Sequence, residues 1–245
     1  MLAQITFSGR QFTVDLNRGF DLSTGFDSQK GPLAWGAGRM EIKPVCIDDW
    51  VGSVREGAPV NFCDVIINPH GQGTHTECVG HITEAQENVN DVLTQYWFAA
   101  RVVSGEAKDK AIDLSAVVLP DEKWPYKALL VRTLPNDEGK LNRNYFEKDP
   151  PHFHPEDLER LADGGVQHFL TDLPSVDPEV DGGALAAHRA FFLKDGRIRF
   201  GQTITEFVFI PDSLPDGDYL LNLQLAPIAM DAAPSRPLLY PIQSS

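Results

Sequence analysis

The sequence predicts an α/β or α+β fold in which residues 1–245 form a single domain. Three features lead to this prediction. Short strand-like segments fill the first half, a helix followed directly by a strand occupies residues 154–172, and two strong strand patterns follow near the C-terminus. No linker rich in proline, glycine and serine divides the chain, and 245 residues with 42% hydrophobic side chains can bury a sizeable core. We therefore expect a mixed sheet flanked by helices.

Four segments of the first half are predicted strands. Residues 4–16 ("QITFSGRQFTVDL") contain two alternating runs around Ser-Gly, which indicates a hairpin. Residues 31–45 read as a loop that leads into a strand. Residues 61–70 ("NFCDVIINPH") alternate and then become apolar, which predicts a strand that ends at Pro69. Residues 126–133 ("YKALLVRT") form a Leu/Val run typical of a buried strand.

The second half alternates between helix and strand signals. Residues 154–165 ("HPEDLERLADGG") begin with proline and acidic residues and end with two glycines, which are helix start and stop signals. Residues 166–172 then predict a strand that ends at Asp172, and residues 183–192 predict a second helix. Two strands are expected at residues 203–210 and 218–225, joined by the turn "PDSLPDGD".

Composition limits the partners and the compartment. The net charge of −14 would repel a polyphosphate, so we expect no nucleic-acid partner. No apolar run approaches the ~20 residues that span a bilayer, and the N-terminus lacks the basic and apolar regions of a signal peptide, so no membrane association is expected. The three cysteines are too few for a disulfide framework and fit a reducing cytoplasm.

The stretch from residue 68 to residue 83, "NPHGQGTHTECVGHIT", concentrates the chemistry. It holds three of the seven histidines, His70, His75 and His81, together with Glu77. Imidazole and carboxylate are ligands for zinc, manganese and similar ions. On an extended chain His75 and Glu77 point to the same side, and His81 does so if extension persists. His70 has the opposite parity, but the glycines at 71 and 73 allow a turn that brings it round.

Other interpretations of this stretch stay open at this point. It could be a polar loop with incidental histidines. Cys78 beside His81 could form a nucleophile–base pair of a metal-free cysteine hydrolase, although a small buried thiol is the simpler role for it.

Two downstream residues extend the cluster. Glu206 lies in the apolar pattern "ITEFVFI", where a buried carboxylate is costly unless it is paired or binds a metal. His188 lies on the predicted helix "LAAHRAFF" among leucine and phenylalanine. Taken alone, Glu206 could instead lie at a sheet edge or pair with an arginine, and His188 could be a hydrogen-bonded core histidine.

Several motifs together resemble the putative cyclase family, which includes bacterial-type kynurenine formamidase and isatin hydrolase. "GTHTECVGH" resembles the family signature H-x-G-T-H-x-D-x-P-x-H, and "FLTDLPSVDP", "LAAHRAFF" and the closing segment from Thr203 onward resemble later family segments. The resemblance covers most of the chain, more loosely before residue 60. It implies a single domain of the swivelling β/β/α type.

The resemblance assigns roles to individual residues. The signature's second histidine, its acid and its last histidine match His75, Glu77 and His81, and the family's later ligand pair matches His188 and Glu206. By this match the first two histidines and the acid bind metal, and His81 acts in acid/base catalysis. Three departures mark a divergent subfamily: His70 stands one residue before the signature's first histidine, Glu77 replaces Asp, and Val79 replaces Pro. The number of ions, one or two, stays open.

The function implied by the resemblance is metal-dependent hydrolysis, with Zn or Mn as the cofactor. The expected substrate is a small aromatic molecule with an amide, formamide or lactam bond. Trp35 is a candidate for the substrate pocket, with ordinary core packing as its alternative. The resemblance also implies a homodimer or a higher homo-oligomer. The alternative function is a metal- or ligand-binding protein of the same fold without hydrolytic turnover.

Overall fold

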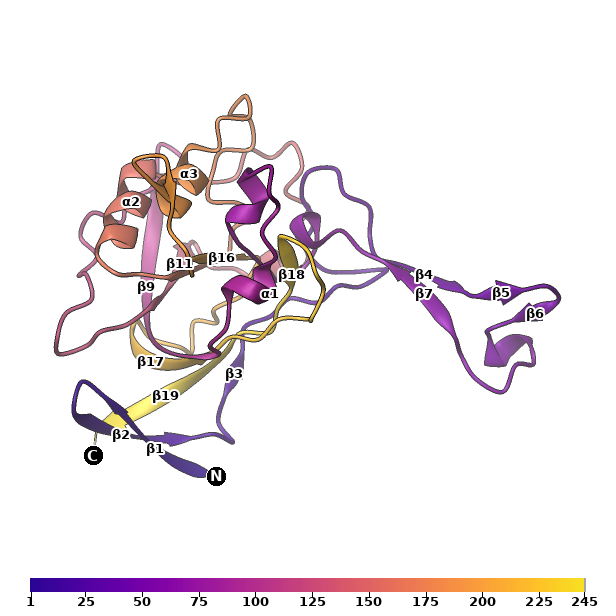
Figure 1. Cartoon of the computed structure of the whole chain (residues 1–245), viewed down its shortest axis with the longest axis horizontal. Coiled ribbons are helices and arrows are strands. Elements are labelled where there is room, and N and C mark those ends of the chain that lie inside the picture. Colours follow the sequence, from indigo (N-terminus) through magenta and orange to yellow (C-terminus); the bar gives the residue numbers. More distant parts are fainter. Residues whose placement is uncertain (245) are drawn as a thin grey trace.

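The computed structural model describes residues 1–244, and a mixed sheet of 13 strands forms the centre of this part of the chain (Figure 1). Along its main path the strands follow the order β1-β2-β19-β17-β9-β11-β13-β16-β8-β18. The middle strands β9, β11, β13 and β16 run parallel, and the strands on either side of them pair antiparallel. The strands are β1 (Leu2–Phe7), β2 (Arg10–Asp15), β3 (Phe20–Asp21), β4 (Glu41–Pro44), β5 (Cys46–Ile47), β6 (Trp50–Val51), β7 (Cys63–Ile66), β8 (His75–Glu77), β9 (Trp97–Lys108), β10 (Ala111–Ile112), β11 (Ala128–Leu134), β12 (His152–Phe153), β13 (His168–Thr171), β14 (Leu193–Lys194), β15 (Arg197–Ile198), β16 (Thr203–Glu206), β17 (Gly217–Asn222), β18 (Ala232–Pro234) and β19 (Leu238–Ser244).

Two helices pack together against one face of the parallel strands (Figure 1). The first of them begins with Pro155, whose missing N–H costs nothing at a helix start, and it is followed by Gly165 in the left-handed region. Alternate residues of β11 divide between the two faces: Leu129 packs in the cluster that includes this helix, whereas Leu130 packs in the cluster on the other face. The helices are α1 (Val89–Val92), α2 (Pro155–Asp163) and α3 (Ala186–Phe192), with 3-10 turns η1 (Val54–Glu56), η2 (Pro69–Gly71), η3 (Val79–Ile82) and η4 (Glu138–Asn142).

Most of the predicted elements are present. The N-terminal hairpin, the buried strand β11, helices α2 and α3 and strand β17 lie where the sequence predicts them. The long strand β9 was not predicted, although it joins the antiparallel and parallel parts of the sheet. The predicted strand 203–210 is too long: β16 ends at Glu206, where Phe207 adopts a φ of 56° and interrupts the extended conformation.

A long arm, residues 41–66, extends away from the sheet (Figure 1). Strands β4 and β7 pair antiparallel to form its stem, and β5, β6 and η1 lie beyond the stem. The strand predicted at 61–70 therefore exists, but it ends at Ile66 and is exposed, since it belongs to a two-stranded ribbon. The arm lies between Trp35 and His70 in the sequence. Because Glu41 pairs with Ile66, its two ends lie together next to the histidine-rich stretch.

Candidate metal centre and active site

Strand β8 carries the first two side chains of the candidate site. His75 and Glu77 lie two residues apart on this strand and share a face, whereas Thr76 points the other way and contacts Thr205 of β16. The predicted parity of His75 and Glu77 is therefore confirmed. The extension does not continue to His81, because the 3-10 turn η3 intervenes, and it is this turn that brings His81 to the same cluster.

His70 reaches the cluster through a tight turn, as the two glycines predicted. It lies in η2, and Gly73 follows with a φ of 53°. A Cβ on Gly71 would lie 2.3 Å from the Cβ of Ala37, so only glycine fits where the chain passes the base of the arm. His70 Nδ1 lies 3.1 Å from Glu77 Oε2.

The two downstream residues meet β8 from neighbouring elements. Glu206 is the last residue of β16, pairs in register with His75, and places Oε2 3.4 Å from His75 Nε2. His188 projects from α3, with Nε2 2.9 Å from Glu77 Oε1 and 3.9 Å from Glu206 Oε1. The structure thus brings together all six residues that the sequence proposed as ligands or catalyst: His70, His75, Glu77, His81, His188 and Glu206.

Backbone strain accompanies this cluster. Trp35, Leu185 and Phe207 all have φ between 46° and 59°, a region that side chains other than glycine rarely adopt. Leu185 precedes α3 and Phe207 follows Glu206, so two of the three adjoin elements that carry site residues. The Phe207 carbonyl accepts hydrogen bonds from the hydroxyls of Thr24 and Thr74, which stabilises its unusual geometry. Such strain is typical of functional sites.

The chemistry of the donor atoms fits a divalent cation. Four buried ligand atoms converge here: His75 Nε2, Glu77 Oε1, His188 Nε2 and Glu206 Oε1. None of them makes a well-aligned hydrogen bond within residues 1–244, although His188 Nε2 and Glu77 Oε1 lie 2.9 Å apart as an ion pair. A buried polar atom without a partner costs about 1–3 kcal/mol, so four in one place call for a common ligand. Ligand atoms of His75, Glu77 and Glu206 lie within 4.8 Å of one another, and so do those of His70, Glu77 and His81. Glu77 belongs to both groups, which leaves room for one ion or two.

The electrostatic field at the cluster favours positive charge. Burial opposes ionisation of His70, but its contacts with Asp231 and Glu77 outweigh burial and raise its pKa to about 10. Burial likewise opposes the charged form of His188, and the carboxylates of Glu77 and Asp177 raise its pKa well above the usual value. The field that holds a proton on these rings would also attract a metal cation.

A cleft of about 210 Å³ opens onto the cluster. His81, whose side chain is 28% exposed, lines it together with Trp35, which is 40% exposed and is therefore not a core residue. Leu185 and Pro178 also line the cleft. Its walls thus combine apolar surface with the cluster of imidazoles and carboxylates.

Two site carboxylates were missed by the sequence analysis. Asp177 accepts hydrogen bonds from the backbone N–H groups of Ala187 and His188, and its Oδ2 lies 2.5 Å from His188 Nδ1. Asp231 lies 2.9 Å from His70 Nε2 and 3.4 Å from His81 Nδ1. Asp177 lies within the quoted segment "FLTDLPSVDP" and could have been singled out there. Asp231 has no local signal, because it reaches the site only through the pairing of β18 with β8.

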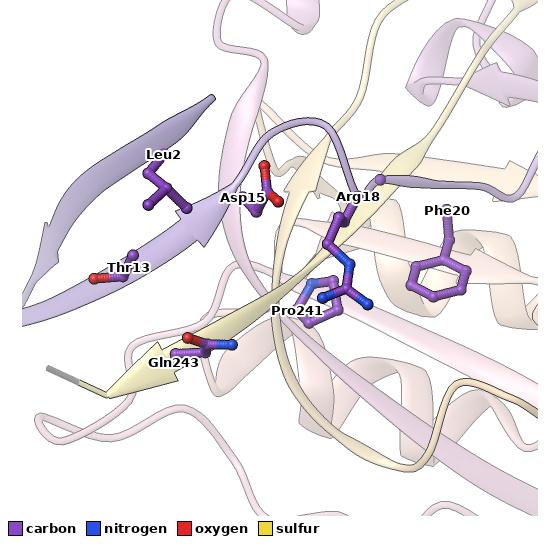
Figure 2. Close-up of a pocket in the computed structure, with 8 residues that line it drawn as sticks. Leu2, Thr13, Asp15, Arg18, Phe20, Pro241 and Gln243 are labelled. Atoms are coloured by element: carbon purple, nitrogen blue, oxygen red, sulfur yellow. The ribbon is translucent and has the colours of Figure 1, made fainter.

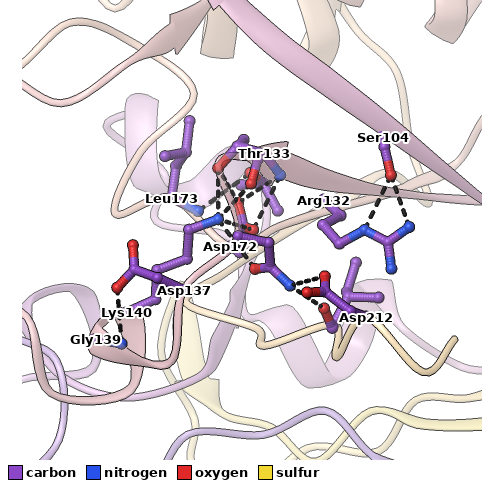
Figure 3. A network of polar contacts seen from close by, with 12 residues as sticks. Ser104, Arg132, Thr133, Asp137, Gly139, Lys140, Asp172, Leu173 and Asp212 are labelled. Carbon is purple, nitrogen blue, oxygen red and sulfur yellow. Dashed lines mark hydrogen bonds and ion pairs between the residues drawn. The ribbon is translucent and has the colours of Figure 1, made fainter.

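A buried ion pair holds Asp172, which directly follows β13 and precedes Asp177 by five residues (Figure 3). Lys140 Nζ lies 2.8 Å from Asp172 Oδ2, and Thr133 donates to the same carboxylate from its backbone N–H and its hydroxyl. Burial raises the pKa of Asp172 despite the nearby Lys140. Asp172 therefore stabilises the turn that follows β13, while Ser175, three residues further on, lines the cleft.

The geometry of Cys78 counts against a cysteine nucleophile. Its thiol is buried and donates to the carbonyl of Glu87, at 3.1 Å. Burial raises its pKa to about 11, so the reactive thiolate is disfavoured. Its role is that of a small core residue.

A larger cavity, of about 550 Å³, lies elsewhere (Figure 2). It is formed by the N-terminal hairpin, the segment after it and β19, and Asp15 and Arg18 are its ionic side chains. Neither histidine nor cysteine lines it. Volume alone therefore does not locate the chemistry, and the smaller cleft at the histidines is the candidate active site.

The fold is shared with solved hydrolase structures. A structure described as a potential metal-dependent hydrolase with cyclase activity superposes with a TM-score of 0.64 at 15% identity, covering 91% of this chain and 97% of that one. Isatin hydrolase A from Labrenzia aggregata superposes with a TM-score of 0.62 at 15% identity, covering 91% and 93%. At 15% identity these structural similarities establish the fold of the chain, which is that of metal-dependent hydrolases of this kind, and nothing about its substrate.

Sequence comparison then defines the family. The family model named Putative cyclase matches residues 20–178. Kynurenine formamidase from Bacillus thuringiensis (strain Al Hakam) is 30% identical over 199 residues, which cover 78% of this chain and 85% of that protein. Kynurenine formamidase from Delftia acidovorans is 27% identical over 192 residues, with the same coverage. The chain belongs to the putative cyclase family, as its signature predicted.

Proposed function

We propose that this protein is a metal-dependent hydrolase that cleaves an amide, formamide or lactam bond of a small aromatic molecule. The observation that carries the proposal is the convergence of four buried ligand atoms, none of them with a well-aligned hydrogen bond, beside an open cleft. The kynurenine formamidase relatives and the fold shared with isatin hydrolase A support the reaction class and the substrate class.

We propose His70, His75, Glu77, His188 and Glu206 as the metal-binding residues. Their mixed nitrogen and oxygen donors suit both Zn²⁺ and Mn²⁺. When bound, a divalent ion would lower the pKa of a water molecule and stabilise negative charge that develops on a carbonyl oxygen. Because Glu77 belongs to two ligand groups, the site can hold one ion or two.

The remaining site residues act on the substrate. His81 lines the cleft and is partly exposed, so its imidazole can give a proton to the leaving nitrogen. Trp35 also lines the cleft, where its ring can stack on an aromatic substrate. The small cleft suits a substrate of one or two rings better than a polymer.

Elemental analysis and a substrate screen test this proposal on one preparation. The purified protein should contain Zn or Mn and should hydrolyse N-formylkynurenine, isatin or a related small amide. A chelator should abolish activity, and the metal should restore it. A folded protein that takes up neither ion would refute the proposal. A metal-loaded protein without activity across such a panel would favour the alternative function, a metal-binding protein without turnover.

We also propose that the protein is a homodimer or a higher homo-oligomer held by the arm. A two-stranded ribbon is at best marginally stable alone, yet this one displays large apolar side chains that are 36% to 58% exposed. Eight such side chains gather on the arm, and a contiguous exposed apolar patch of this kind marks an interaction surface. These residues are Ile42, Ile47, Trp50, Val54, Val60, Phe62, Val65 and Ile66.

The mass of the protein in solution tests the arm. Light scattering should give a multiple of 27.1 kDa for the wild type and a lower mass for the double variant Phe62→Ser/Val65→Ser. Phe200→Ser is the matched control, because Phe200 is 77% exposed but lies outside the arm. A monomeric wild type, or equal masses for the arm variant and the wild type, would refute the role of the arm.

The compartment and the domain count also remain proposals. No helix among residues 1–244 is long and apolar enough to cross a membrane. Cys46, Cys63 and Cys78 are all free thiols, which supports a cytoplasmic location. Strands from both ends of the chain meet in one sheet, which supports a single domain over residues 1–245; residue 245 lies outside the described part.

A further inference from the structure

Asp231 lies in the closing segment of the chain, about 150 residues after the histidine signature, yet it contacts two site histidines. One carboxylate oxygen, Oδ2, lies 2.9 Å from His70 Nε2 and 3.4 Å from His81 Nδ1. Its backbone is held in place as well, because the Asp231 carbonyl accepts a hydrogen bond from the backbone N–H of Cys78. The next residue, Ala232, pairs in register with Glu77. The carboxylate is therefore aimed at the imidazoles by the sheet itself.

The two nitrogens of His70 face two different carboxylates. Nδ1 faces Glu77 Oε2 at the centre of the cluster, at 3.1 Å, and Nε2 faces Asp231. His188 has the reverse arrangement: its Nδ1 faces Asp177, and its Nε2 faces Glu77. Each ring thus contacts one carboxylate on the side away from the cluster, Asp231 for His70 and Asp177 for His188, and presents its other nitrogen to Glu77. Outer carboxylates of this kind fix the orientation of metal-binding histidines and raise their basicity.

The carboxylate on the outer side of His70 matters because His70 stands one residue before the position of the signature's first histidine. When a histidine is moved by one residue, its side chain leaves the backbone at a different place and in a different direction. Which ring nitrogen faces the site then depends on the contacts that orient the ring. In this chain the ring presents Nδ1 inward, and a partner for Nε2 stabilises that orientation. Asp231 is the only such partner within hydrogen-bonding distance of Nε2 among the described residues.

We propose that Asp231 is a positioning residue that holds the displaced His70 with Nδ1 toward the metal site. The proposal rests on the proposed metal-dependent function, because it treats His70 as a ligand. Asp231 would contact neither substrate nor metal and would act only through His70. The contact with His81 is longer and adds a second, weaker restraint on the same side of the cluster.

Metal affinity and the spectrum of bound cobalt test this proposal. Wild type, Asp231→Ala and Asp231→Asn are stripped of metal and titrated with Zn²⁺ and with Co²⁺, whose visible absorption reports its ligand geometry. Asp231→Ala should weaken affinity by about 10–100-fold and alter the Co²⁺ spectrum. Asp231→Asn should lose less, because an amide oxygen can still accept from Nε2–H. Asp212→Ala is the matched control, because Asp212 is an exposed aspartate that bonds Asn136 and should leave both readouts unchanged.

A double variant separates positioning from a general structural effect. If Asp231 acts through His70, adding Asp231→Ala to His70→Ala should weaken affinity no further. An equal loss in both backgrounds, or wild-type affinity and spectrum in Asp231→Ala, would overturn the proposal and leave the proposed function intact. A wild-type protein that binds neither ion would instead overturn the proposed function, and this proposal with it. Should Asp231→Ala fail to fold, Asp231→Ser gives the same prediction, since its side chain is too short to reach His70.

Discussion

His81→Asn should separate metal binding from turnover. The imidazole is partly exposed in the cleft, stacks on His70 with ring centroids 4.3 Å apart, and keeps its Nε2 3.9 Å from Glu77 Oε2. The proposed ligands His75, Glu77, His188 and Glu206 lie deeper and are buried, so replacing His81 should leave them in place. We therefore expect the variant to keep its metal and to lose the proton that the leaving nitrogen needs.

The size of the effect follows from the role. General acid–base catalysis contributes typically 10²–10⁴-fold, which corresponds to about 3–5 kcal/mol of barrier. Asparagine can hydrogen-bond but cannot relay a proton, so His81→Asn and His81→Ala should lose similar factors in kcat. The loss of folding stability should be small, because the side chain is not fully buried.

The assay measures metal content and kcat on the same preparation, with Glu206→Gln as a comparison variant that should lose metal. Ligand atoms of His81 lie within 4.8 Å of those of His70 and Glu77, so the geometry also permits coordination by His81. Metal loss in proportion to activity would make His81 a ligand. Near-normal kcat with metal intact would remove it from the mechanism.

Three further predictions concern stability and chemistry. Lys140→Met leaves the buried Asp172 carboxylate without its cation and should lower the free energy of unfolding by about 3–5 kcal/mol in chemical denaturation; adding Asp172→Asn should restore part of it, and no recovery would contradict the pairing. Burial lowers the pKa of His168 to about 3, so only the unfolded chain takes up its proton between pH 6.5 and 3, and stability falls as the pH falls. Between pH 8 and pH 5 this term should cost the wild type about 2 kcal/mol relative to His168→Gln, and parallel pH profiles would exclude it. Cys78→Ser should keep its metal and its sensitivity to chelators, whereas inactivation of the wild type by thiol alkylation alone would revive the cysteine mechanism.

Much of this site was determined by the sequence because the relevant patterns are local. Two residues on one strand share a face, so His75 and Glu77 could be paired from their spacing alone. The glycines beside His70 indicated the turn that brings it round. A carboxylate within an apolar strand pattern pointed to Glu206 as a buried ligand, with a sheet edge or an arginine partner as the alternative, and the structure places it buried at the cluster.

Tertiary structure decided what depends on pairing between distant segments. His81 reaches the cluster through a 3-10 turn and not through an extended chain. Within this turn Gly80 passes close to the backbone of Glu87 and to Asp231, which are distant from one another in the sequence. Asp231 itself enters the site only because β18 pairs with β8, a contact across more than 150 residues that no local pattern encodes. The arm shows the same limit. The two strands of its stem were predicted, but their exposure was not, because alternation in a sequence does not reveal whether the rest of the protein covers a strand.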